Sequence, residues 1–136
     1  MPLDFELIEF HDSTLDGISI ENENTLCLSW KQLFVFFVKD KNSKLYELMG
    51  YKARLSFVDA KELKVSCPLG GELKISELEL TGVDARSVRP NAQKLSIARA
   101  EMIFTNGGRI SVEASGCLIN LLEPTGFCEE WEGALE

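Results

Sequence analysis

Alternation of apolar and polar residues with a period of two constrains this chain more than any other feature. In four segments every second residue is apolar, so an extended backbone places the apolar side chains on one face. The segments are residues 25–30, 51–57, 63–67 and 110–114. Because helical spacing is sparse elsewhere, the pattern predicts a mostly β fold built from strands that each bury one face.

Turn signals between the alternating runs predict how the strands connect. Asn106 and Gly107 separate two such runs, and Asn-Gly in that position is a strong signal for a two-stranded hairpin. Residues 21–24 and 68–71 carry weaker turn signals of the same kind. We therefore expect an antiparallel sheet in which strands that are neighbours in sequence pair in space.

The apolar positions change parity inside several predicted strands. The change occurs within residues 5–10, across Gly17 in residues 15–20, and within residues 73–80. A parity change indicates an inserted residue, and such β-bulges bend a sheet. We expect a further bend at Lys31-Gln32, because residues 25–38 are long for one strand. The predicted fold is a curved antiparallel sheet that forms a β-sandwich or a partly open barrel, with at most one or two short helices.

The apolar run at residues 33–38 has no polar position to face solvent. It is too short to cross a membrane, so it predicts a central strand covered on both faces; the alternative is an edge strand held by a second subunit. Directly after it, Ser43 has the position of a helix N-cap and Gly50 that of a C-terminal glycine. These residues predict a short helix between two strands.

The chain length predicts one domain with one core, and the C-terminal end differs from the rest. We assign residues 1–122 to a single antiparallel β domain and residues 123–136 to an acidic tail. Phe127, Trp131 and Leu135 recur every four residues, which is typical of a short amphipathic helix. Such a helix would present acids to a partner; the alternative is a tail that docks on its own domain.

Charge is distributed in blocks, although the formal net charge is only −8. Residues 1–30 carry −7, residues 31–54 carry +4 and residues 123–136 carry −5. One interpretation is solvated strand faces; the other is an acidic field that attracts a basic protein and repels nucleic acid and membrane phosphates. On the second interpretation the candidate partner-binding residues are Asp12, Asp16, Glu21, Glu23, Phe127, Glu129, Glu130 and Trp131.

No catalytic or metal centre is expected from the residues that carry chemistry. His11 is the single histidine, and in His11-Asp12-Ser13 the members of a hydrolase triad are adjacent, so an extended backbone points them to opposite faces. The motif predicts a turn in which Asp12 or Ser13 bonds the backbone. The four cysteines have neither metal-ligand spacing nor a need to pair, so we expect reduced thiols and no metal or cofactor.

The order of these motifs resembles a group of small bacterial proteins. Phe10-His11-Asp12-Ser13 with its following strands, then residues 51–57, then Phe104 to Ile110 with the Asn-Gly turn, is similar to all-β proteins of unknown function with an F-H-D opening. Some of these resemble immunity proteins that neutralise toxins. The resemblance covers about residues 5–122 and implies stoichiometric binding without catalysis.

These observations favour a cytoplasmic binding protein that uses an acidic surface and is not an enzyme. The opening residues lack the basic and apolar regions of a secretory signal, so we expect neither secretion nor membrane attachment. One alternative is a ligand-binding β domain with an apolar cavity near Trp30, Phe34, Phe36 and Phe57. A remote alternative is a hydrolase-like enzyme centred on His11. Nothing in the pattern indicates a homo-oligomer.

Overall fold

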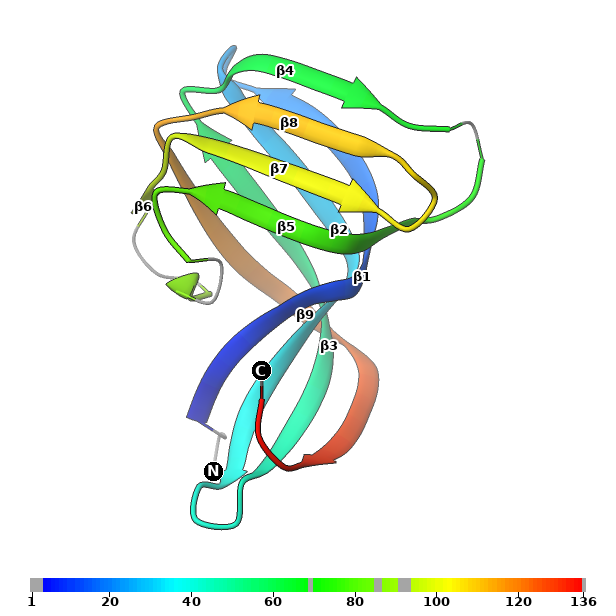
Figure 1. Ribbon diagram of the computed structural model, residues 1–136, viewed down its shortest axis with the longest axis vertical. Coiled ribbons are helices and arrows are strands. Elements are labelled where there is room, and N and C mark those ends of the chain that lie inside the picture. Colours follow the sequence, from blue (N-terminus) through cyan, green and yellow to red (C-terminus); the bar gives the residue numbers. More distant parts are fainter. Residues whose placement is uncertain (1–3, 69, 85–86, 91–93, 136) are drawn as a thin grey trace.

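The computed structural model describes residues 4–68, 70–84, 87–90 and 94–135. In this part of the chain nine strands form one antiparallel sheet, and no α-helix is present (Figure 1). The strands are β1 (Asp4–Glu21), β2 (Thr25–Asp40), β3 (Leu45–Val58), β4 (Lys61–Ser66), β5 (Leu73–Thr81), β6 (Leu95–Ser96), β7 (Arg99–Phe104), β8 (Arg109–Glu113) and β9 (Gly116–Glu132). Their order across the sheet is β4-β8-β7-β5-β1-β2-β3-β9-β6.

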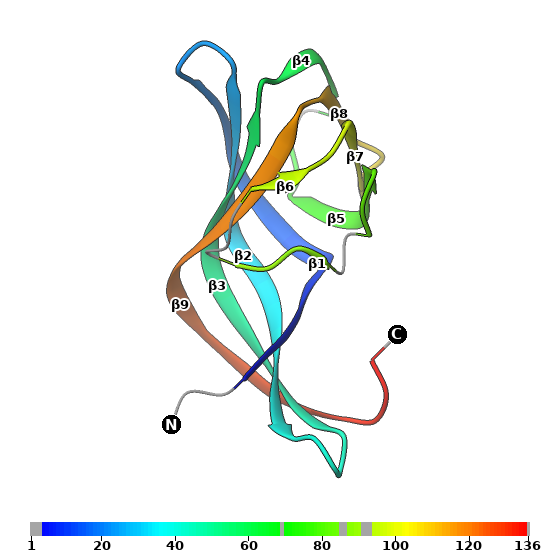
Figure 2. The ribbon, with the colours of Figure 1, turned by 90° about the vertical axis from the view of Figure 1, so that its left-hand side faces the viewer.

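The sheet is curved into two layers and does not close into a barrel, which confirms the predicted fold class. The long strands β1, β2, β3 and β9 form one layer, and the short strands β5, β7, β8 and β4 cross in front of their upper halves (Figures 1 and 2). Below this crossing the four long strands continue without the second layer. The molecule therefore has a two-layered half and a half in which a single sheet extends alone.

The hydrophobic core lies between the two layers. Alternate residues of the long strands meet alternate residues of β5, β7 and β8, as their period of two requires. The largest fully buried side chains are Trp30, Phe57, Phe104, Leu26, Leu28, Leu33, Leu55, Ile75, Met102, Ile110, Ile119 and Val35. Burying side chains of this size contributes about 1.5–3 kcal/mol each relative to leaving them exposed.

Irregularities in strand pairing occur where the sequence changes parity. The register between β1 and β2 shifts between Phe5 and Leu7 and again between Leu15 and Gly17. The β5–β7 register shifts between Ile75 and Glu77. In β2 the shift against β3 lies between Trp30 and Leu33, where a bend was predicted at Lys31-Gln32. The predicted bulges are confirmed, and they allow long strands to curve from one half of the molecule into the other.

Two of the three predicted turns join neighbouring strands and one does not. The Asn-Gly turn joins β7 to β8, and residues 22–24 form the turn between β1 and β2. The predicted pairing across residues 68–71 is wrong, because β4 pairs with β8 and β5 pairs with β7 and β1. β8 and β7 therefore lie between β4 and β5 in that layer.

The prediction of a helix at residues 43–50 is wrong, because the Ser43 side chain bonds Asp40 in a turn instead of capping a helix. Its hydroxyl donates to Asp40 Oδ2 at 3.0 Å, and Asp40 Oδ1 accepts the N–H of Asn42 at 3.0 Å. Asp40 thus closes the turn between β2 and β3, and the chain is a strand again from Leu45. The hydrogen bond from the Ser43 side chain lowers the pKa of the exposed Asp40 carboxyl below its ordinary value.

The helix expected in the C-terminal tail is also wrong. β9 is one strand from Gly116 to Glu132, and it pairs with β3 on both sides of residues 122 and 123, through Leu121 and Glu123. The apolar run at residues 33–38 lies in the central strand β2, between β1 and β3, as predicted, but it is not covered on both faces, because Phe34 and Phe36 line an open groove. Leu33 and Val35 face the core, whereas Phe34 and Phe36 face the opposite side of the lower half.

Candidate functional site

A groove lies on the face of the lower half that the second layer leaves uncovered. Its volume is about 490 Å³, and it combines aromatic, aliphatic and acidic side chains. We call it the aromatic groove; it is lined by Leu7, Glu9, His11 and Asp12 of β1, Phe34 and Phe36 of β2, Leu48 of β3, Phe127, Glu129 and Trp131 of β9, and Ala134 and Leu135 beyond β9.

Strand register places the groove residues in rows across the four long strands. Leu7 lies opposite Phe36, which lies opposite Leu48, which lies opposite Glu129. In the next row Glu9 lies opposite Phe34. Side chains directly opposite on one face are close neighbours, so the floor of the groove is set by the register.

The aromatic rings contact one another edge to face. The Phe34 and Phe127 ring centroids are 5.1 Å apart, and those of Phe36 and Trp131 are 5.7 Å apart. Phe36 is buried beneath Trp131, whose side chain is 42% exposed. A tryptophan that shields another ring while it faces solvent offers apolar contact area to a ligand.

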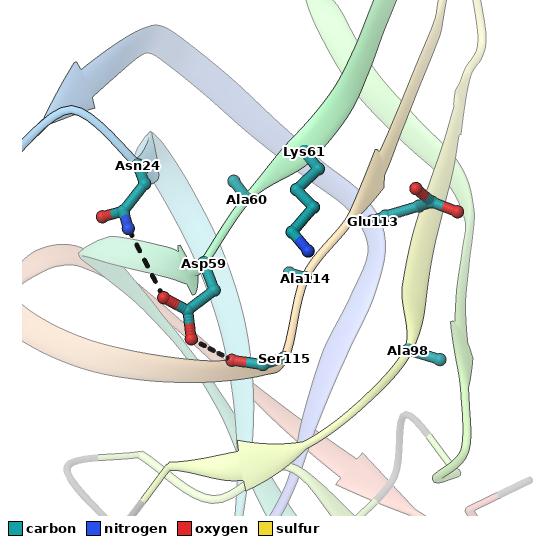
Figure 3. A pocket seen from close by; sticks show the side chains of 8 residues that line it. All are labelled: Asn24, Asp59, Ala60, Lys61, Ala98, Glu113, Ala114 and Ser115. Atoms are coloured by element: carbon teal, nitrogen blue, oxygen red, sulfur yellow. Dashed lines mark hydrogen bonds between the residues drawn. The ribbon is translucent and has the colours of Figure 1, made fainter.

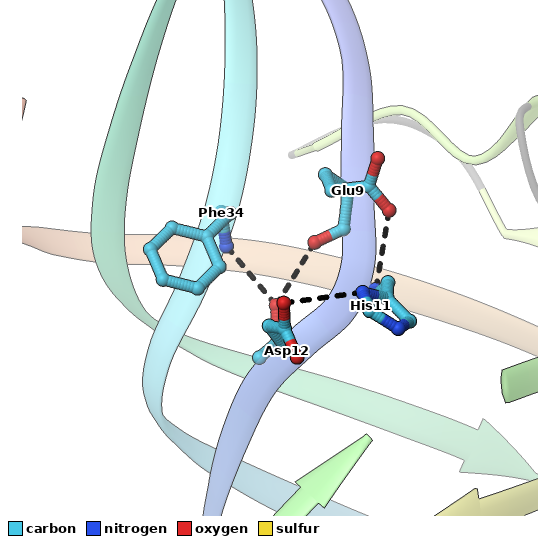
Figure 4. Close-up of polar contacts among 5 residues, drawn as sticks. Glu9, His11, Asp12 and Phe34 are labelled. Carbon is cyan, nitrogen blue, oxygen red and sulfur yellow. Dashed lines mark hydrogen bonds and ion pairs between the residues drawn. The ribbon is translucent and has the colours of Figure 1, made fainter. Parts of the chain in front are cut away.

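Acidic groups border the aromatic floor on both sides. Glu9 and Asp12 come from β1, and Glu129 comes from β9. The Glu9 carboxylate accepts the backbone N–H of His11 at 3.2 Å, and His11 Nδ1 lies 3.2 Å from Asp12 Oδ2 (Figure 4). Among the residues that the structure describes, no Lys or Arg forms an ion pair with these three carboxylates.

A bulge in β1 brings His11 and Asp12 to this border. The register against β2 shifts between Glu9 and Thr14, and Asp12 has a φ of 66°. Ser13 is fully buried at the bulge: its hydroxyl donates to the Glu9 carbonyl at 2.9 Å and accepts the N–H of Phe34 at 3.2 Å (Figure 4). Ser13 thus bonds the backbone as expected, but the predicted turn at this motif is wrong, because residues 11–14 form a bulge inside the continuous strand β1.

Four basic side chains of β2 and β3 form ion pairs with acids elsewhere on the chain. Lys52 of β3 pairs with Glu123 of the neighbouring β9, whereas Lys39 and Arg54 reach acids two strands away. The pairs are Lys39–Glu130 at 4.0 Å, Lys52–Glu123 at 3.3 Å, Arg54–Glu21 at 3.4 Å and Lys31–Glu72 at 3.9 Å. All are exposed and contribute about 0–1 kcal/mol each.

The groove gathers half of the partner-binding residues suggested by the sequence. Asp12, Phe127, Glu129 and Trp131 line it together. The other four lie elsewhere: Asp16 is exposed further along β1, Glu21 and Glu23 lie at the turn between β1 and β2, and Glu130 faces Lys39.

Sequence reasoning missed Leu7, Glu9 and Leu48 and misplaced two aromatic residues. Phe34 and Phe36 were expected to share an apolar cavity with Trp30 and Phe57, but the latter two are buried in the core. Residues 34 and 36 alternate with the core residues 33 and 35, so an extended strand places them on the opposite face. This alternation is the sequence signal that separates Phe34 and Phe36 from the core residues Trp30 and Phe57.

Comparison with known proteins adds no assignment to this geometry. No protein-family model, curated protein or solved structure matches the chain. In addition, none of the described residues forms a helix that is long and apolar enough to cross a membrane. The properties of the groove therefore have to be argued from its own side chains.

A second, more polar cleft of about 590 Å³ lies at the other end of the long strands (Figure 3). Asp59, with a φ of 53°, accepts a hydrogen bond from Ser115 Oγ at 2.7 Å and one from Asn24 Nδ2 at 3.4 Å. These bonds join three chain corners, so Asp59 has a structural role there. The cleft is lined by Asn24, Asp59, Ala60, Lys61, Ala98, Glu113, Ala114 and Ser115.

All four cysteines are free thiols, and the surroundings of three of them favour the neutral form. Burial raises the pKa of Cys27, and it raises the pKa of Cys117 to about 11. Cys128 is exposed, but its thiol donates a hydrogen bond to Glu47 Oε1 at 2.6 Å, which raises its pKa. Because the thiolate is the reactive form, these environments disfavour nucleophilic chemistry at the three sites. Among the described residues, no group of three or more His, Cys, Asp or Glu gathers to hold a metal ion.

Proposed function

We propose that the chain is a non-catalytic cytosolic binding protein whose aromatic groove takes a basic segment of a protein partner. One observation carries the proposal: Glu9 and Glu129, from opposite sides of the groove, border an aromatic floor without a basic partner among the described residues. Elsewhere on β9, Glu123 and Glu130 are paired with lysines. The groove therefore has an acidic charge that an external cation can neutralise.

Lysine and arginine side chains suit both parts of this surface. Their aliphatic stems pack against apolar side chains, and their charged heads are attracted to aromatic faces and carboxylates. A cation over an aromatic ring contributes about 0.5–1 kcal/mol at an exposed site and about 2 kcal/mol when desolvated. Trp131 and Phe127 are the accessible rings, and Glu129 lies between them in sequence.

The acidic charge of the groove argues against nucleic acids and membrane surfaces as partners. Carboxylates at the groove repel the phosphates of nucleic acids and of membrane surfaces.

The hydroxyl nearest to His11 in sequence, that of Ser13, is hydrogen-bonded to the backbone of Glu9 and Phe34. A role like that of the immunity proteins which the sequence resembles, neutralising a partner by occupying its surface, needs binding alone.

Charge reversal within the groove tests the proposal. The probe is a peptide of about eight residues in which Lys alternates with Val, long enough for one strand. Titrated calorimetrically at low and moderate salt, it should bind the wild-type protein and lose about tenfold or more in affinity in the double variant Glu9→Lys, Glu129→Lys.

Asp16→Lys is the matched control, because Asp16 is an exposed acid of β1 outside the groove. Each groove reversal made singly should weaken binding more than this control, which makes the same charge change. Equal losses in Asp16→Lys and in either single groove variant would mean that only net charge matters. That result, or equally tight binding of a Glu-Val peptide, would remove the support for the groove as the binding site.

A further inference from the structure

In the described part of the chain, the outer edge of β9 has few strand partners. β3 pairs with the inner edge of β9 from Gly116 to Pro124 and again from Cys128 to Glu132. On the outer side, the residues that the structure describes provide only β6 and Pro90 as partners, and these meet β9 between Gly116 and Ile119. The edge from Cys128 to Glu132 has no strand beside it in the described part of the chain (Figure 1).

The direction of the backbone groups along this edge follows from one hydrogen bond. Gly133 N–H donates to the carbonyl of Lys44 at 3.0 Å, so these opposite residues form a hydrogen-bonded pair. Such pairs alternate along an antiparallel ladder, and the register shows no shift between Leu45 and Met49. The backbone groups of Glu129 and Trp131 therefore face β3. Those of Cys128, Glu130 and Glu132 face outward.

The acidic charge of this edge determines which kind of strand can pair with it. Glu129, Glu130 and Glu132 lie within four consecutive residues, and residues 123–136 contain no Lys or Arg. Pairing with the same edge of a second copy would bring carboxylates opposite carboxylates, which is unfavourable. Lys39, whose Nζ lies 4.0 Å from Glu130 Oε2, comes from β2, two strands inward from this edge. An incoming strand with basic residues meets opposite charge on both of its faces.

We propose that the basic segment of the partner adds to β9 as an extended strand along Cys128–Glu132. This inference rests on the proposed function and names the way in which the groove is occupied. The outward backbone groups of Cys128, Glu130 and Glu132 form main-chain hydrogen bonds with the segment. Alternate side chains of the segment then lie beside Glu129 and Trp131 on the groove face, where a cationic side chain is attracted both to the carboxylate and to the aromatic ring.

Amide hydrogen exchange measured by NMR on the full chain, with the Lys-Val peptide as the probe, tests the proposal. Without peptide, the amides of Glu129 and Trp131 should exchange slowly and those of Cys128, Glu130 and Glu132 quickly. Saturating peptide should slow the three outward amides by about tenfold or more, because each gains a main-chain acceptor. The inward amides should change little.

Three other outcomes separate the inference from the proposed function. If the peptide shifts the Trp131 indole resonance but leaves the outward amides fast, the groove binds and strand addition is refuted. If no groove resonance shifts, the proposed function fails as well. Protection of the outward amides without peptide, together with a doubled mass in light scattering, would show a second copy on the edge and would overturn the inference.

A proline substitution gives a second, independent measurement. Glu130→Pro removes an outward N–H and leaves the bonds of β9 to β3 in place, which is the position where an edge strand accepts proline. Glu130→Gln removes the same charge and keeps the N–H. We expect about a tenfold loss of peptide affinity in Glu130→Pro and less than about a threefold loss in Glu130→Gln. Equal affinities in two folded variants would contradict strand addition.

Discussion

The Ser13 hydroxyl accepts the backbone N–H of Phe34 at 3.2 Å, across a gap in the β1–β2 ladder. The same hydroxyl donates to the Glu9 carbonyl at 2.9 Å. One buried side chain therefore satisfies two backbone groups that the bulge would otherwise leave without a partner. Through these bonds it fixes the backbone of two groove residues, Glu9 and Phe34.

Ser13→Ala should destabilise the fold, because it leaves the N–H of Phe34 and the carbonyl of Glu9 unsatisfied. The expected loss in the free energy of unfolding is about 1–3 kcal/mol, measured by urea denaturation. Ser19→Ala is the control, an exposed serine of the same strand, and should change stability by less than about 0.5 kcal/mol. Equal stability of the two variants would show that the hydroxyl is dispensable.

Gly50→Ala should also destabilise the protein. A Cβ at Gly50 would overlap Gln32 Oε1 and lie 2.6 Å from Thr125 Oγ1, two atoms that are hydrogen-bonded to each other. Gln32 Oε1 is the end of a flexible side chain that can rotate away, so the cost is close to that of the lost hydrogen bond, about 0.5–1.5 kcal/mol, read from the midpoint of thermal unfolding. Gly17→Ala is the matched control, because a Cβ there meets no atom within 4 Å. A Gly50 variant as stable as the Gly17 variant would refute the steric argument.

The two tryptophans should respond differently to quenchers of fluorescence. Trp30 is 2% exposed and Trp131 is 42% exposed, so only Trp131 should be quenched by acrylamide. Near Glu129 the caesium cation should quench more strongly than iodide, and added salt should reduce the difference. Trp131→Phe should leave a blue-shifted emission that resists all three quenchers. Quenching that survives this substitution would mean that Trp30 is accessible.

Stability should fall in alkaline solution in a way that depends on Cys117. The ordinary thiol pKa of 9.0 is raised to about 11 by burial. Above pH 9 the unfolded chain loses the proton that the folded chain still holds, so the free energy of unfolding decreases until about pH 11, by up to about 3 kcal/mol from this group. Below pH 9 the thiol contributes its full stabilisation.

Cys117→Ala isolates this contribution, because all other groups titrate in both proteins. At pH 7 the wild type should be the more stable protein, since the variant loses a buried side-chain atom. The stability difference measured by urea denaturation should shrink between pH 9 and pH 11. A difference that stays constant over this range would show that the Cys117 thiol does not titrate differently in the two states.

The strands and their bends were predictable because each leaves a local mark in the sequence. A change of apolar parity is a direct record of an inserted residue, and it located the shift near Gly17, whereas the length of residues 25–38 located the bend at Lys31-Gln32. The Asn-Gly hairpin was predictable for the same reason, since its geometry depends on two adjacent residues. The neighbours of β4 and β5 were not, because a turn signal shows that the chain reverses and carries no information on which distant strand it meets.

The C-terminal strand was misread because a spacing of four does not distinguish a helix from a strand. Phe127 and Trp131 would share a face in a helix as well as in a strand, because four residues are close to one helical turn and equal two strand repeats. The groove was predicted only in part for a related reason. Its acids and aromatics come from β1, β2 and β9, and the register that assembles them depends on pairing between residues more than 80 positions apart, such as Leu48 with Glu129.

The two ends of the described chain emerge at the same end of the sheet, and this geometry determines how the protein responds to force. Asp4 lies opposite Val38 and Glu132 lies opposite Leu45, so β1 and β9 both terminate beside the turn between β2 and β3. A pull applied between the two ends would peel β1 from β2 and β9 from β3 one residue pair at a time, instead of loading many pairs at once. The half of the molecule that carries the aromatic groove should therefore open at low force, while the two-layered core beyond it stays intact.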